Sequence, residues 1–185
     1  MDKVRHITPE KEMNVSQLVE QMKDSGFGAR NLGQASLIFK EMLGDKDCRI
    51  FLGVAGAMVP GGMKKIIIDM IKGGRISALV TTGATLTHDM VEALGESHYQ
   101  CDFWDDGDFQ DNGYDRMHNV FMKSEVYEIL EKFFIGNWQK FQEARNITTF
   151  LRKIGELLSD KEESILRICY EKNIPIFCPG IADSG

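Results

Sequence analysis

The stretch from Cys48 to Glu92 constrains the fold more than any other part of the chain. It holds two short apolar runs, 48–54 and 76–80, and each run leads into a turn that contains glycine. Between the runs, apolar side chains recur at helical spacing: Met63, Ile66, Ile67, Met70 and Ile71. Short apolar runs bounded by glycine are typical of buried parallel strands, although a run this short also fits a buried helix segment. The pattern as a whole predicts a strand–helix–strand unit.

The two turns that follow these strands are the first candidates for a binding site. The residues of interest are Gly56, Ala57 and Pro60 in the first turn and Thr81, Thr82 and Gly83 in the second. In an open parallel sheet, ligands bind beyond the carboxyl ends of the strands. The glycines do not spell the usual dinucleotide motif, so the first turn fits either an anion site at a helix start or a plain tight turn. The threonine hydroxyls could bind ribose or phosphate, or cap the next helix.

The rest of the sequence predicts helices around this sheet and one more strand. The predicted helices are 14–23, 34–43, 87–94, 124–134, 137–143, 148–158 and 160–172, and the last strand is 174–178. The glycines of 26–33 predict a loop, and a capping-box pattern at 159–162 predicts the start of the last helix. The acidic and aromatic segment 96–119 predicts a long loop with one short strand. We divide the chain into a helical arm, 1–45, and a nucleotide-site domain, 46–185.

Composition excludes several classes of protein. A net charge of −6 argues against a nucleic-acid partner, because phosphate binding needs a basic face, and it would suit a cationic substrate. No apolar run approaches the roughly 20 residues of a membrane helix, and the first residues lack a signal-peptide core. Four cysteines in a chain of 185 residues are typical of free cytosolic thiols rather than of a disulfide framework.

Three single polar residues are weaker candidates. Asp183 follows the last predicted strand, where a carboxylate could bind ribose hydroxyls or an amine, or serve as an ordinary turn residue. His88 stands in the first predicted turn of helix 87–94 and could face the same crevice, although most lone histidines have no such role. Asp89, in the same turn, suits the positive end of the helix dipole.

No metal site is predicted. His98 and Cys101 have a possible zinc spacing, but no second pair of ligands completes it. The acidic segment resembles a calcium loop only in its early positions, because Asn119 stands where a bidentate glutamate is required.

Four segments together resemble deoxyhypusine synthase, in both order and interval: 25–33, 54–63, 79–84 and 169–185. The resemblance covers nearly all of the chain. It implies an α/β, Rossmann-like three-layer fold with a mostly parallel sheet and flanking helices, C-terminally incomplete here. It also implies a cytoplasmic homotetramer, a dimer of dimers, with its sites at a dimer interface.

The resemblance further implies an NAD-dependent transferase of hypusine biosynthesis. In that family, NAD takes a hydride from spermidine, and the aminobutyl group passes through an imine on an enzyme lysine to a lysine of a translation factor precursor. The family's cofactor contacts fall on Gly56, Ala57, Pro60, Thr81, Thr82, Gly83, His88 and Asp183. No lysine of this chain matches the imine-forming lysine, which is expected beyond Gly185. We therefore expect the 185 residues alone to be inactive.

Some positions depart from the eukaryotic pattern. Gly56-Ala57 and Pro60 stand where eukaryotic members carry Ser-Asn and a serine, and His88 stands where they carry glutamate. The chain is more similar to the prokaryotic deoxyhypusine synthase-like branch. Three functions therefore remain open: transfer to a protein lysine, a homospermidine-type synthase with a small amine acceptor, and a nucleotide-binding or structural protein without catalysis.

Overall fold

The computed structural model describes residues 2–102, 106–159 and 162–181. The chain divides into two compact units, residues 1–49 and 50–185, and each is considered by itself. Asp183 lies outside the described residues, so its predicted role stays a prediction. No helix in the described part of the chain combines the length and the apolar character needed to cross a bilayer.

The first unit is a pair of helices, α1 (Val15–Met22) and α2 (Phe27–Gly44). Asn14 caps α1, because its side chain accepts from the Gln17 N–H at 2.9 Å and its own N–H donates to the Gln17 side chain. The loop predicted at 26–33 is wrong. Gly26 is the N-cap of α2, and Gly33 lies inside that helix, where an added Cβ would meet the Lys23 backbone nitrogen at 2.3 Å. Gly33 allows α2 to pack closely against the end of α1, and it does not mark a helix end.

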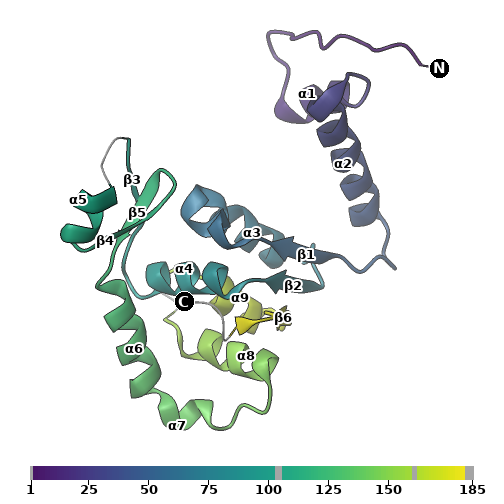
Figure 1. Ribbon diagram of the computed structural model, residues 1–185. Helices are drawn as coiled ribbons and strands as arrows, with labels where there is room; N and C mark the ends of the chain where they lie inside the picture. Colours follow the sequence, from purple (N-terminus) through teal and green to yellow (C-terminus); the bar gives the residue numbers. More distant parts are fainter. Residues whose placement is uncertain (1, 103–105, 160–161, 182–185) are drawn as a thin grey trace. The chain divides into compact units, whose positions relative to one another are not determined.

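In the second unit, strands and helices alternate along the chain, and the last strand joins the same sheet as the first two (Figure 1). Its elements in order are β1 (Phe51–Val54), η1 (Gly56–Met58), η2 (Val59–Met63), α3 (Lys64–Lys72), β2 (Ala78–Thr81), α4 (Gly83–Ala93), β3 (Tyr99–Gln100), α5 (Asp106–Asp111), β4 (Tyr114–Met117), β5 (Val120–Lys123), α6 (Val126–Gly136), α7 (Trp138–Phe141), α8 (Ile147–Leu157), α9 (Ile165–Glu171) and β6 (Ile176–Phe177).

Strands β1, β2 and β6 form a parallel sheet in the order β1-β2-β6 (Figure 1). Val54 at the end of β1 is in register with Thr81 at the end of β2, and Val80 is in register with Phe177 at the end of β6. The carboxyl ends of the three strands therefore meet at one edge. The predicted α/β fold with a parallel sheet and flanking helices is confirmed.

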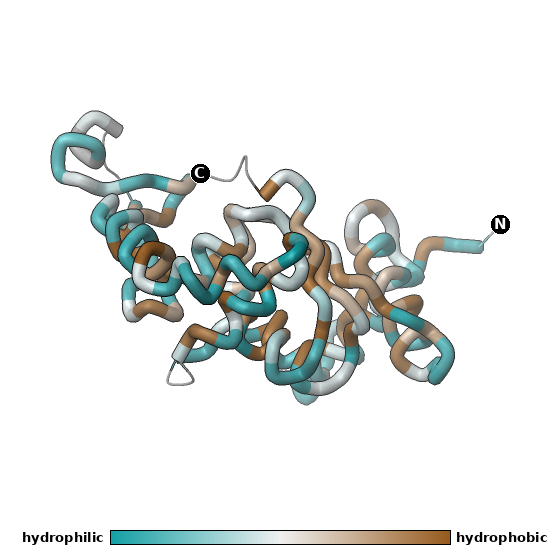
Figure 2. Tube along the Cα trace, turned by 90° about the horizontal axis from the view of Figure 1, so that it is seen from below, coloured by the Kyte–Doolittle hydropathy of each residue, from teal (hydrophilic) through white to brown (hydrophobic). Residues whose placement is uncertain are grey.

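Apolar side chains from the central strand and its helices form the core. Fully buried examples are Ile68, Ile71, Leu79, Leu151, Ile165 and Leu166. Hydrophobic and hydrophilic stretches alternate along the helices, as amphipathic helices require (Figure 2).

The predicted inward stripe of the helix that became α3 is wrong in part. Ile67 and Ile71 are buried as predicted, but Met63 and Ile66 are 40% and 56% exposed, and Ile68 takes the inward position. The sequence places isoleucine at three consecutive positions, 66–68. Such a run predicts an amphipathic helix, but it does not show which of the three isoleucines face the core.

A second sheet stands where a loop was predicted. Strands β3, β5 and β4 form an antiparallel sheet, and Figure 1 shows them beside α5, apart from the parallel sheet. Phe121 of β5 stacks on Tyr99 and meets Tyr114 edge-on, with ring centroids 5.3 Å apart in each case. The loop prediction for 96–119 is wrong, because strands of two to four residues among acidic side chains carry too short an alternation to be recognised.

A buried carboxylate joins two helices of the second unit. Helix α4 begins at Gly83, so Asp89 lies in its middle, not in its first turn as predicted. Its carboxylate accepts from the Ser164 hydroxyl at 2.8 Å and from the N–H groups of Ile165 and Leu166 at 2.8 and 2.9 Å. Asp89 thus caps the start of α9 from another helix.

The predicted start of the last helix is corrected by the same contacts. Helix α9 begins at Ile165, and Ser164 is its N-cap, whereas the sequence predicted a start at residue 160 through the pattern at 159–162. Residues 160 and 161 lie outside the described part of the chain. A capping box is only a local pattern, and here a carboxylate distant in sequence supplies the acceptor instead.

Replacing Asp89 by asparagine tests this connection. Asparagine keeps one acceptor oxygen but presents an NH2 group to the donors that met the other oxygen. We expect Asp89→Asn to lower the free energy of unfolding by about 2–4 kcal/mol, measured by urea denaturation. The control Asp69→Asn changes an exposed aspartate of α3 and should cost less than about 0.5 kcal/mol. Equal stabilities of the two variants would contradict the assignment.

Candidate functional site

The two turns predicted as a site are brought together at the carboxyl edge of the sheet. The Thr81 hydroxyl donates to the Val54 carbonyl at 2.9 Å, and the Thr85 hydroxyl donates to the Ala55 carbonyl at 3.0 Å. Both hydroxyls come from the second turn or the helix after it, and both carbonyls belong to the end of β1. These bonds hold the two strand ends in a fixed relation.

Gly56 allows the two turns to approach closely. A Cβ atom at this position would lie 3.1 Å from the Ala84 Cβ and 3.2 Å from the Thr82 Oγ1. Both distances are shorter than ordinary van der Waals contact, so any larger residue would push the turns apart. The glycine is therefore required by the contact between the turns.

The start of α4 offers unpaired backbone donors at this edge. Thr82 is the N-cap residue, but its side chain makes no capping hydrogen bond and lies 3.4 Å from the Thr85 hydroxyl. The alternative that Thr82 serves as a side-chain cap is not observed. The first N–H groups of a helix have no intrahelical partner, and they favour an anion. This turn thus fits the negatively charged pyrophosphate of a dinucleotide.

The segment after β1 is irregular. Gly56 and Ala57 lie in the short helix η1, and Pro60 is the second residue of η2, where its missing N–H leaves no bond unmade. Gly62 has a φ of 84°, which interrupts the helical backbone before α3 begins at Lys64. The first-turn candidates therefore lie together on one short connection.

A chain of polar side chains runs along α4 from His88. The His88 Nδ1 lies 3.0 Å from the His98 Nε2, and the His98 Nδ1 lies 2.8 Å from the Glu92 Oε1. The second Glu92 oxygen accepts from the Lys64 ammonium at 3.0 Å. We call His88, His98, Glu92 and Lys64 the polar chain.

The sequence identified only His88 of the polar chain. The sequence suggests a possible zinc spacing for His98 and Cys101, whereas the structure pairs His98 with His88 and Glu92. The spacing of His88 and Glu92, four residues apart on one helix face, is the signal that could have suggested a connected pair. Among the described residues, no group of three His, Cys, Asp or Glu side chains is placed to hold a metal ion.

Burial sets the charge of His88. Desolvation and the neighbouring His98 lower the pKa of His88 from 6.5 to about 4, although Glu92 opposes them. His88 is therefore neutral near pH 7. Burial tends to raise the pKa of Glu92, but hydrogen bonds from His98 and Lys64 bring it below its ordinary value.

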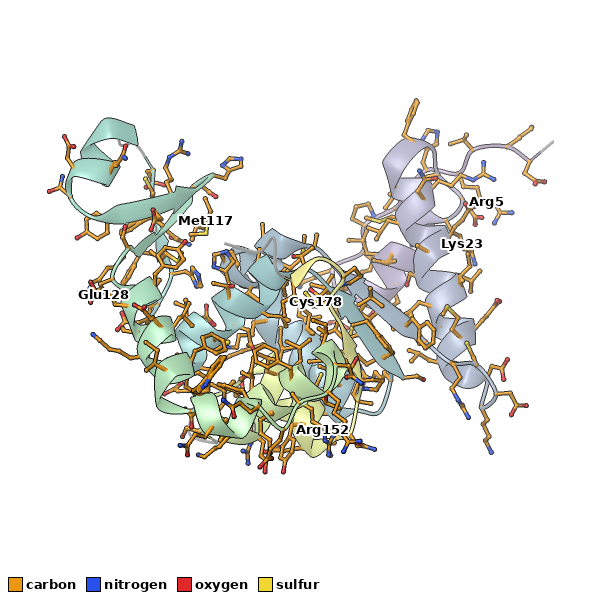
Figure 3. All side chains as sticks on the ribbon, turned by 60° about the horizontal axis from the view of Figure 1, so that its bottom comes forward. Arg5, Lys23, Met117, Glu128, Arg152 and Cys178 are labelled. Carbon is orange, nitrogen blue, oxygen red and sulfur yellow. The ribbon has the colours of Figure 1, made fainter. Side chains whose placement is uncertain are left out.

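A cavity at the opposite edge of the sheet is separate from these turns. It has a volume of about 290 Å³ and is lined by residues 173–176, which lead into and begin β6, and by Arg152. The Arg152 guanidinium lies 4.9 Å from the centre of the Tyr170 ring and donates to Asn173 at 2.8 Å. Figure 3 shows Arg152 and Cys178, the residue that follows β6, well apart. Arg152 and Asn173, two polar side chains that line this cavity, already bond to each other, so we do not place the site there.

Fold and site together define an α/β protein with joined turns at the carboxyl edge of a parallel sheet, and comparison with known proteins gives its family. A deoxyhypusine synthase family model matches residues 17–185. A probable deoxyhypusine synthase of Archaeoglobus fulgidus is 39% identical over 93% of this chain and 57% of its own length. One from Methanothermobacter thermautotrophicus is 37% identical over 98% of this chain and 60% of its own length.

Two further comparisons agree. A deoxyhypusine synthase-like protein of Chlorobaculum parvum is 33% identical over 97% of this chain and 53% of its own length. A crystal structure assigned to a deoxyhypusine synthase of Entamoeba histolytica has the same fold, with a TM-score of 0.65 at 21% identity over 94% of this chain and 63% of the other. The chain belongs to the deoxyhypusine synthase family, and it spans little more than half the length of these curated relatives.

Adding one methyl group at Gly56 tests the contact between the turns. We expect Gly56→Ala to lower the free energy of unfolding by about 1–2 kcal/mol, because the new Cβ overlaps Ala84 and Thr82. The matched control is Gly53→Ala in β1, where an added Cβ meets no atom within 4 Å. Urea denaturation of both variants measures the difference. A Gly56→Ala protein as stable as the control would show that the turns are not in contact.

The lowered pKa of His88 predicts a pH dependence of stability. Unfolded chains bind a proton at this histidine near pH 6.5, but the folded chain binds it only near pH 4. The free energy of unfolding should therefore fall as the pH drops from 6.5 to 4, by at most about 3 kcal/mol from this group.

The variant His88→Gln should flatten that part of the profile, measured by urea denaturation at a series of pH values. His118→Asn, which changes an exposed histidine, should leave the profile as it is. An identical slope in wild type and His88→Gln would mean that His88 titrates normally in the folded chain.

Proposed function

We propose that this chain carries the dinucleotide-binding part of an NAD-dependent transferase, which moves an aminobutyl group from spermidine to an acceptor amine through an enzyme-lysine imine. The single observation that carries the proposal is the contact between the two turns across Gly56 at the start of α4. Membership of the deoxyhypusine synthase family supports the transferase class. The protein lysine is the proposed acceptor, and a small amine is the alternative.

The residues present fit NAD in specific ways. The N–H groups at the start of α4 would hold the pyrophosphate, and the close contact across Gly56 keeps the first turn beside them. The exposed Thr82 hydroxyl, which makes no cap, would bond to a ribose or phosphate oxygen. Ala57, Pro60, Thr81, Gly83 and His88 remain proposed contacts by family resemblance, and so does Asp183. When bound, NAD supplies a hydride acceptor for the amine substrate.

The chain's charge agrees with a polyamine substrate. Its net charge of −6 attracts cations such as spermidine. The imine requires a neutral lysine, and the family resemblance assigns this role to none of the lysines of this chain. A cytoplasmic homotetramer with sites at subunit interfaces is part of the same proposal.

Thr82 provides a direct test of cofactor binding. We expect Thr82→Val to weaken NAD binding about fivefold to tenfold, the loss of roughly one hydrogen bond, measured by isothermal titration calorimetry. Its folding should change little, because Thr82 makes no side-chain cap. Thr87→Val, farther along the same helix, is the matched control and should bind NAD as wild type does. Equal loss in both variants would reject the proposed contact.

The proposed reaction is tested on the full-length gene product. With NAD and spermidine, borohydride should trap a covalent adduct on a lysine. Addition of a protein lysine acceptor or of putrescine then separates the two acceptor classes by product mass. If NAD binds but no adduct forms with spermidine, the chain belongs to a dinucleotide-binding protein without this transfer, and the proposal is wrong.

A further inference from the structure

We propose that Glu92, His98 and His88 form a proton relay, which holds the Nε2 of His88 as a proton acceptor at the inner end and exchanges protons with solvent at the Glu92 end. This inference rests on the proposed function for its substrate, but its geometry stands alone.

The path is continuous in hydrogen-bond distances. The heavy-atom separations are 3.0 Å from His88 to His98 and 2.8 Å from His98 to Glu92. The His98 side chain is 5% exposed and the His88 residue is 9% exposed. The middle of the path is thus shielded from water, and protons can leave it only at its ends.

The bonds themselves select the tautomers. A carboxylate only accepts, so the His98 Nδ1 carries a hydrogen and donates to Glu92. In a neutral His98 ring, Nε2 is then an acceptor, and the His88 Nδ1 must donate to it. A neutral His88 with its hydrogen on Nδ1 has a free lone pair on Nε2. No described residue hydrogen-bonds to that nitrogen.

His88 lies on the same face of α4 as a residue of the joined turns. Thr85, His88 and Glu92 follow one another at spacings of three and four residues, so they lie on one face of α4. Thr85 on that face bonds to the Ala55 carbonyl at the end of β1. The relay therefore begins one helical turn from the joined turns.

The other end of the relay opens on water. Glu92 lines a cavity of about 510 Å³, together with Lys64, Lys65, Glu96 and Ser97. Glu92 is the only member of the three relay residues among the side chains that line this cavity. A proton on Glu92 can exchange there with solvent.

Charged side chains flank the outer part of the relay. Glu92 faces His98 directly from α4, and Lys64 from α3 bonds to the other Glu92 oxygen. Asp89 lies 3.6 Å from the same ammonium and balances it. An imidazolium at His98 would thus meet the Glu92 carboxylate, while burial keeps His88 neutral. In the proposed relay, His88 passes the proton on, and His98 receives it beside the Glu92 carboxylate.

In the proposed reaction, oxidation of the amine breaks a C–H and an N–H bond. NAD, when bound, would supply the hydride acceptor, and the N–H proton would pass to the His88 Nε2. The His88 Nδ1 hydrogen moves to the His98 Nε2, which leaves His98 as an imidazolium beside Glu92. Reduction of the final imine takes the same proton back, so the relay returns to its first state.

The test reads the tautomers directly by long-range ¹H–¹⁵N NMR of the histidine-labelled chain. The chain has four histidines, so His6→Gln and His118→Asn assign the remaining two signals. At pH 7 we expect the His88 ring with its hydrogen on Nδ1. In His98→Leu, which removes the acceptor, the ring should change to the Nε2–H form. A wild-type His88 with its hydrogen on Nε2 overturns the relay.

A second readout keeps the proposal testable if His98→Leu alters packing. In the full-length protein, Glu92→Gln should lower kcat at least tenfold with KM for spermidine within about twofold, and His118→Asn should change neither. An unchanged kcat in Glu92→Gln also overturns the relay. If the tautomers are as expected but the wild-type protein does not oxidise spermidine, the proposed function fails and the hydrogen-bonded geometry is retained.

Discussion

The buried carboxylate of Asp89 is the interaction on which the second unit depends. It lies on α4, accepts three hydrogen bonds from Ser164, Ile165 and Leu166, and has no exposed surface. Burial raises its pKa, whereas Lys64 and these donors lower it. A charge held this way is costly to leave unpaired, so α4 and α9 must keep their relative position. The strand β6 follows α9 directly, and this fixes how the third strand joins the sheet.

The same helix, α4, serves both structure and the proposed chemistry. Asp89 anchors α4 to α9, and the neighbouring His88 and Glu92 point into the polar chain. Lys64 connects the two groups, because it bonds to Glu92 and lies near Asp89. The first turn of this helix, at Thr82, meets Gly56 across the sheet edge. A rigid α4 therefore positions the turns and the relay together.

Much of the fold could be predicted from sequence, and the errors have physical causes. The parallel unit was recognised because short apolar runs and glycine turns are local signals, and parallel register then brings Thr81 beside Val54. Local sequence patterns gave incomplete predictions where a residue distant in sequence determines the structure. Asp89 caps a helix more than 70 residues away, and His98 bonds to His88 from outside the helix. The spacing of these residues in the sequence predicts neither of the two contacts.

The most direct test of the account follows amide ¹H–¹⁵N shifts of the chain as NAD is added. We predict that the largest shifts occur at Gly56, Thr82 and Gly83, the residues of the two joined turns. Saturable shifts confined to these turns and the start of α4 would support a dinucleotide site at the carboxyl edge of the sheet. Unchanged turns up to millimolar NAD, or shifts centred on the α8–α9 cavity, would contradict it.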